Sequence, residues 1–202
     1  MLHEDQPARP WGTVTPDFWA VADESGWADD EEALGYEEPA VFAAARASLP
    51  GNSSADDFAR RFAELATCLN RPCTDAELAL AAQDAGLFDQ NVTAALGPAD
   101  SNIASVRELR GLIARRQGHH TEAARWHLHT AGLHVVASGV SDPRARASAK
   151  HTLADWRDIP DPAERAAVAR EILPMLTAIA GPGAKPTKEV QAYLEAHCID
   201  TQ

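Results

Sequence analysis

Apolar side chains recur every three or four residues along most of this chain, which is the spacing of amphipathic α-helices. The clearest example is residues 108–132, which predict two helices folded back on each other through a turn at Gly118. The first of these two helices begins near Asp100 or Ser101. Four apolar residues share its buried face: Ile103, Val106, Leu109 and Ile113.

The second helix of this hairpin begins near Thr121, whose hydroxyl group suits an N-cap. Trp126 and Leu133 fall on the side of the helix opposite to a narrow apolar seam. A helix with apolar residues on two sides packs between neighbours, so we expect this one near the centre of the fold. The seam consists of Ala124, Leu128, Ala131 and Val135.

Capping residues, prolines and glycines mark further helices on both sides of the hairpin. Gly86 is the expected end of one of them, and Thr187 is the expected cap of the last one. Strand patterns are nearly absent, so the chain is predicted to be an all-α, single-domain bundle of about eight or nine helices. An arm of residues 1–38 precedes the bundle of residues 39–202. The further helices are expected at residues 16–24, 39–48, 54–71, 75–86, 89–96, 143–156, 163–180 and from 187 onward.

Two of these helices, residues 75–86 and 89–96, are separated by a short turn with a glycine, which is the spacing of a helix-turn-helix. Residues 78–96 resemble the helix-turn-helix of bacterial transcription regulators, with small Ala82 and Gly86 in the family's order. The resemblance implies contacts to DNA. The residues placed to make them are Gln90, Asn91, Thr93, Arg107 and Arg110.

The charge of this segment argues against nucleic-acid binding. No Lys or Arg occurs between Cys73 and Val106, whereas five acidic residues do. Affinity for duplex DNA comes largely from neutralising its phosphates, and this segment would repel them. We therefore expect residues 78–96 to be a structural unit and nucleic acid to be an improbable partner.

The central hairpin, residues 105–136, resembles a single tetratricopeptide unit. Gly111, Gly118 and Ala123 occupy positions where that family has small residues. A solenoid needs about three or more stacked units to bury its faces, and no second copy lies one period away. The hairpin is therefore interpreted as part of a bundle.

The composition is that of a soluble domain, since 45% of the 202 residues are hydrophobic. No stretch approaches the roughly 20 apolar residues needed to span a bilayer, and the first residues lack the order of a signal peptide. The three cysteines, Cys68, Cys73 and Cys198, have no CxxC spacing, which predicts reduced thiols. We expect a cytoplasmic protein that does not associate with membranes.

The net charge of −12 is concentrated at one end of the chain. Residues 1–38 hold eleven acids and one base, Arg9, a balance of −10 that leaves −2 for the other 164 residues. Aromatic residues are interleaved with these acids, which is unlike a disordered tail. Such an arm either docks onto a basic partner or packs on the chain's own core. The aromatic residues are Trp11, Phe18, Trp19, Trp27 and Tyr36.

Histidine is the most suggestive chemical feature, because six of the eight fall within residues 119–151. His120, His127 and His134 are seven residues apart and share one flank of their helix. Successive members are separated by about 10 Å, too far to ligate one ion, so we expect no metal site and no cofactor. A histidine general base oriented by Glu122 or Asp155 would need a pocket, which Trp126 would also line.

No catalytic signature such as GxSxG, a P-loop or GxGxxG is present. The sequence therefore favours a non-catalytic regulatory or adaptor protein that binds another protein through its helical hairpins or its acidic arm. Two alternatives stay open: a small helical enzyme and a helix-turn-helix regulator. The catalytic candidates of the enzyme are His120, Glu122, Trp126, His127 and His134.

Overall fold

The computed structural model describes residues 53–97 and 100–197, which form seven helices and no strand. This confirms the all-α class, although the described part holds fewer helices than the eight or nine predicted. The predicted helices at residues 16–24 and 39–48, and the arm of residues 1–38, lie outside the described residues. The helices are α3 (Ser53–Leu69), α4 (Asp75–Leu96), α5 (Ser101–Arg116), α6 (His120–Ser138), α7 (Pro143–Asp158), α8 (Pro162–Ala180) and α9 (Lys185–His197).

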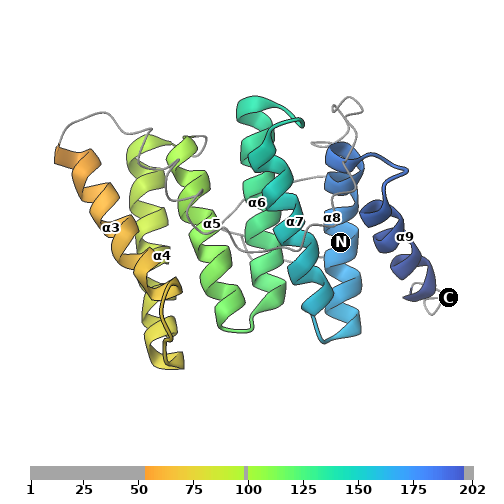
Figure 1. Cartoon of the computed structure of the whole chain (residues 1–202), viewed down its shortest axis with the longest axis horizontal. Helices are drawn as coiled ribbons and strands as arrows, with labels where there is room; N and C mark the ends of the chain where they lie inside the picture. The colour runs from red at the N-terminus through yellow and green to blue at the C-terminus, as the bar shows by residue number, and fades with distance from the viewer. Residues whose placement is uncertain (1–52, 98–99, 198–202) are drawn as a thin grey trace, which may run out of the picture.

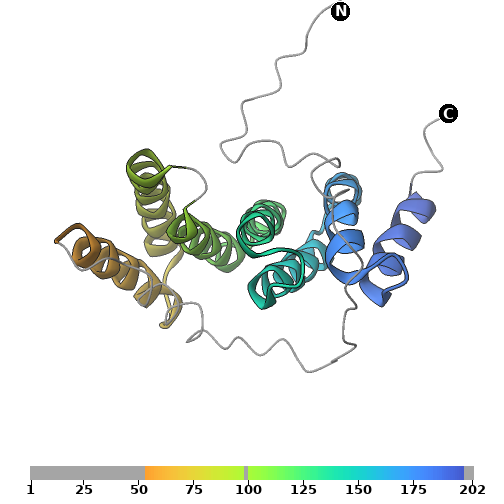
Figure 2. The same cartoon turned by 90° about the horizontal axis from the view of Figure 1, so that it is seen from above.

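The helices stand side by side in a row that follows their order in the sequence (Figures 1 and 2). Most contacts join helices that are adjacent in the chain, and in addition α3 contacts α5 and α6 contacts α8. None of the helices in the described residues combines the length and apolar character needed to cross a lipid bilayer.

Two apolar clusters fill the row, and α6 contributes to both. One cluster lies among α3, α4 and α5, where the Phe58 ring contacts those of Phe62 and Phe88, and Leu133 of α6 packs against it. The other lies among α6, α7, α8 and α9 and contains three members of the predicted seam, with Val135 packed against it. This confirms that α6 lies between neighbours on two sides.

The turn between α5 and α6 follows the sequence prediction at Gly118. This glycine has a φ of 76°, which favours a residue without a Cβ atom. Its N–H donates to Arg115 O at 2.9 Å, and His119 N–H donates to Ala114 O at 2.9 Å, which is the Schellman pattern. The turn directs α6 back along α5.

Two predicted N-caps are wrong. Helix α6 begins at His120 after His119, and no side chain caps it, whereas the hydroxyl group of Thr121 donates to Glu164 Oε2 at 2.8 Å. Helix α9 begins at Lys185, and the buried hydroxyl group of Thr187 donates to Gly181 O at 2.9 Å. Glu164 belongs to α8, so Thr121 has a tertiary partner, whereas Gly181 lies only six residues before Thr187, at the end of α8.

The predicted end of a helix at Gly86 is also wrong, because residues 75–96 form one continuous helix, α4. Thr74 caps it with Glu77 in the expected capping box. The buried face runs through Gly86 without a change of period, so packing favours continuation of the helix over a turn. That face consists of Leu78, Ala81, Ala85, Phe88, Asp89 and Val92.

Candidate functional site

The candidate catalytic histidines of α6 lie inside the row of helices, in a polar interior between α5, α6 and α7. His127 is fully buried and His134 is nearly so. They meet acidic residues from the two flanking helices, Glu108 of α5 and Asp155 of α7. These contacts join residues 26 and 28 positions apart in the sequence.

His127 and Arg115 both bind the carboxylate of Asp155. His127 Nδ1 lies 2.8 Å from Asp155 Oδ2. Arg115 donates to Asp155 Oδ1 and, at 3.0 Å, to His151 O. Burial alone would raise the pKa of Asp155, but the hydrogen bonds from His127 and Arg115 hold it below its usual value. The carboxylate is therefore ionised and accepts, so the proton of His127 lies on Nδ1.

His134 and Ser148 bind the carboxylate of Glu108 in a similar way. The hydroxyl group of Ser148 donates to Glu108 Oε1 at 2.8 Å, and His134 Nε2 lies 3.3 Å from the same oxygen. Burial opposes ionisation of Glu108, yet the hydrogen bond and the electrostatic interaction with His134, followed by the hydrogen bond of Ser148, lower its pKa. The interior thus holds two ionised carboxylates, each with its own donors.

Gly111 of α5 allows the His127 ring to lie against the helix backbone. A Cβ atom at this position would lie 2.6 Å from His127 Nε2 and 2.8 Å from its Cδ2. Nε2 is buried and has no hydrogen-bond partner among the described residues. The reactive nitrogen that a general base would need therefore faces packed backbone.

Gly111→Ala is expected to lower the free energy of unfolding by about 1 to 3 kcal/mol, because the new methyl group overlaps a buried ring held by Asp155. Gly86→Ala is the matched control, since its methyl group would meet only Arg110 Nη2, at 3.9 Å. The Gly86→Ala change should raise the free energy of unfolding by about 0.5 to 1 kcal/mol, because alanine is more favourable than glycine inside a helix. Urea denaturation measures both changes. A loss of stability in Gly86→Ala would contradict the continuous helix α4. A gain of stability in Gly111→Ala would contradict the packing of Gly111 against His127.

A second polar cluster lies between α4, α5 and α6. It contains the two arginines that were expected to contact DNA. Arg107 Nε donates to Asp89 Oδ1 at 3.2 Å, and Arg110 Nη1 donates to Asp89 Oδ2 at 2.7 Å. Arg110 also lies 3.7 Å from the centre of the Trp126 ring, and Arg107 contacts His129 Nε2. Both guanidinium groups are thus bound within the fold.

The three polar residues expected to contact bases lie on α4 at different depths. Gln90 and Asn91 are exposed, whereas Thr93 is partly buried and donates to Asp89 Oδ1 at 3.2 Å. Arg107 and Arg110 bind α4 through Asp89, which is buried.

The remaining enzyme candidates are dispersed along α6. Trp126 is buried, and its Nε1 donates to Glu122 Oε1 at 3.1 Å. His120 and Glu122 line a shallow cavity of about 470 Å³ near Pro160, one turn or more from His127. The described residues contain no group of three or more His, Cys, Asp or Glu side chains that would hold a metal ion.

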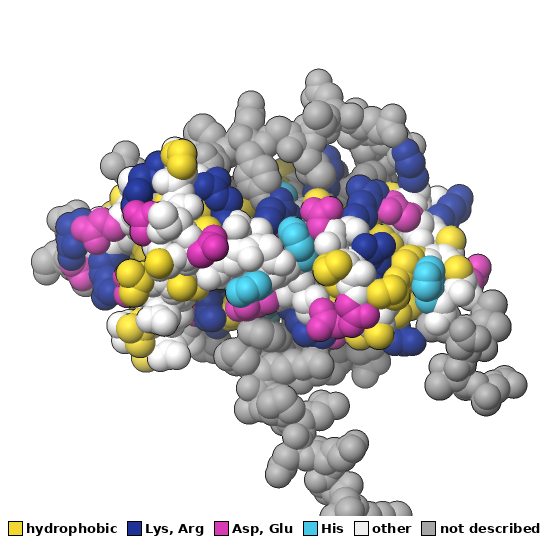
Figure 3. Space-filling model, turned by 90° about the horizontal axis from the view of Figure 1, so that it is seen from below, with side chains coloured by type: hydrophobic (Ala, Val, Ile, Leu, Met, Phe, Trp, Pro, Cys, Tyr) yellow, Lys and Arg dark blue, Asp and Glu magenta, His cyan; other side chains and the backbone are white. Residues whose placement is uncertain are grey.

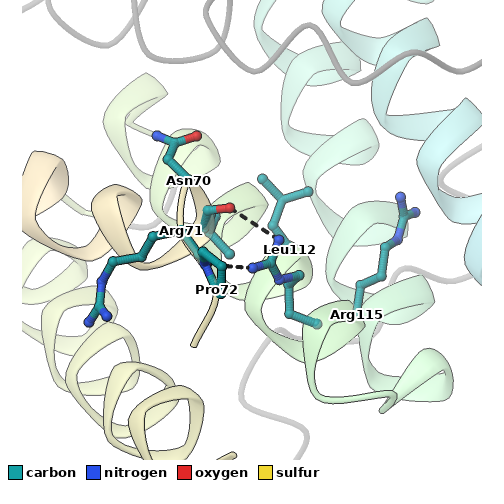
Figure 4. Close-up of a pocket in the computed structure, with 7 residues that line it drawn as sticks. Asn70, Arg71, Pro72, Leu112 and Arg115 are labelled. Atoms are coloured by element: carbon teal, nitrogen blue, oxygen red, sulfur yellow. Dashed lines mark hydrogen bonds between the residues drawn. The ribbon is translucent and has the colours of Figure 1, made fainter. Parts of the chain in front are cut away.

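A larger cavity, of about 540 Å³, lies where the end of α3 meets the end of α5 (Figure 4). Its arginines are bound to other groups. Arg71 and Arg115 point to opposite sides in Figure 4, toward Glu77 and Asp155 respectively. Arg116 donates to Leu69 O at 3.1 Å and Arg71 O at 2.9 Å. Arg116 thus links the end of α5 to the end of α3.

Asp155 was predicted as a partner for a histidine, whereas Glu108, Ser148 and Arg115 were not predicted. The available signal was the position of Glu108 within the apolar face of its helix, between Ala104 and Leu112. An acid at such a position needs a buried partner. The identity of that partner depends on how the helices pack.

The outer face of α4 is the most prominent exposed apolar feature of the described part. Leu80 is 62% exposed and Leu87 is 55% exposed. Seven residues make almost two helical turns, so both side chains project on the same side, opposite to the buried face. Hydrophobic side chains also gather at the α3 and α4 end of the molecule in Figure 3.

Comparison with known protein families, with curated proteins and with solved structures finds no match to this chain. The inference of function therefore rests on the chain's own residues. The buried polar interior and the exposed face of α4 are the two features that bear on it.

Proposed function

We propose that this protein is a non-catalytic cytoplasmic adaptor that binds another protein through an exposed face of its helices. The observation that carries the proposal is the pair of exposed leucines on α4, Leu80 and Leu87. Large apolar side chains that recur on one helix face favour association, because their burial removes apolar surface from water.

The buried polar interior supports a non-catalytic role over the enzyme alternative. A general base has to come within hydrogen-bond distance of its substrate. His127 is fully buried between Asp155 and Gly111, and His134 is paired with Glu108 inside the same interior. These pairs orient and stabilise the contacts between α5, α6 and α7.

The acidic arm of residues 1–38 is a second element through which the adaptor would bind. Its charge and aromatic residues fit a basic partner, and it lies outside the described residues. Binding through the exposed face of α4 and binding through the arm therefore lead to different expected results, which one experiment can compare.

The test places a photo-crosslinking amino acid in the full chain, inside cells, at one position at a time. The positions are Leu87 on α4, Trp19 in the arm and, as a control on another helix, Val136, which is 63% exposed. The proposal expects an adduct of one defined mass from Leu87 or Trp19 and not from Val136. The crosslinked protein, once purified, should bind the purified chain. Absence of adducts from both positions would overturn the adaptor function.

A further inference from the structure

We draw no further inference here: the strongest candidate, the cavity of about 540 Å³ where the end of α3 meets the end of α5, has its three arginine side chains bound to carboxylates or backbone carbonyl groups of the fold, so nothing in it selects a class of ligand.

Discussion

Between about pH 6.5 and pH 4, the free energy of unfolding is expected to fall by about 2 to 3 kcal/mol for each of two histidines, His129 and His151. The pKa of His129 is lowered to about 4 by burial and by the positive charge of Arg107, against an opposing effect of Asp89. Burial, His127 and Arg115 likewise lower the pKa of His151 to about 4, while Glu108 and Asp155 oppose the shift.

The sign follows from proton binding. The ordinary histidine pKa is about 6.5, so between that value and about 4 the unfolded chain binds a proton that the folded protein excludes. Stability is therefore complete above this window and is lost as the pH falls through it. Asp155 and Glu108 have lowered pKa values. The stability that they contribute is therefore present above the ordinary pKa of a carboxyl group and is lost as the pH falls through the lowered values.

Urea denaturation at intervals of pH measures this loss. His129→Gln and His151→Gln should each remove about half of it, because each removes one of the two excluded protons. His119→Gln is the control, since His119 is exposed on the turn before α6. Stability that stays constant across the window in the unaltered protein would contradict the prediction.

Asp155→Ala is expected to lower the free energy of unfolding by about 3 to 5 kcal/mol, the range for breaking one partner of a buried ion pair. The change leaves the Arg115 side chain, which is only 18% exposed, without its carboxylate. It also leaves His127 Nδ1 without its acceptor inside the fold. Asp155→Asn retains the shape of the side chain and should cost less.

The matched control is Glu189→Ala, which breaks the ion pair with Arg157. That pair joins side chains that are 45% and 35% exposed, so its loss should cost about 0 to 1 kcal/mol. Chemical denaturation of the two variants compares a buried pair with an exposed pair, each of which has one member on α7. Equal losses would contradict the structural role of the interior between α5, α6 and α7.

Local signals account for most of the helix ends that were predicted correctly. Asp100, Asp142 and Asp161 each accept a hydrogen bond from a backbone N–H in the first turn of the helix that follows. Gly118 turns the chain because its φ of 76° suits glycine. Such features depend on a few neighbouring residues, so they can be recognised without knowledge of the fold.

Two of the errors, at Gly86 and Thr121, come from competition with tertiary contacts. Gly86 was expected to end a helix, but the apolar face on both sides of it has one uninterrupted period and packs on α3 and α5. Thr121 was expected to cap a helix, but its hydroxyl group donates to Glu164 Oε2 of α8. Thr187, the other expected cap, lies inside the first turn of α9 and donates to Gly181 O, six residues earlier. A local preference of about 1 kcal/mol yields readily to such contacts.

The sequence alone determined that this protein is built of helices, which faces of those helices are apolar and where several of them begin. The tertiary structure decided which polar residues meet: His127 with Asp155, and His134 with Glu108. Helical spacing assigns a residue to a face of its own helix, but it does not identify the helix that packs there. The contact is selected because a buried charge is tolerated only beside a group that satisfies it, and that group lies far away in the chain.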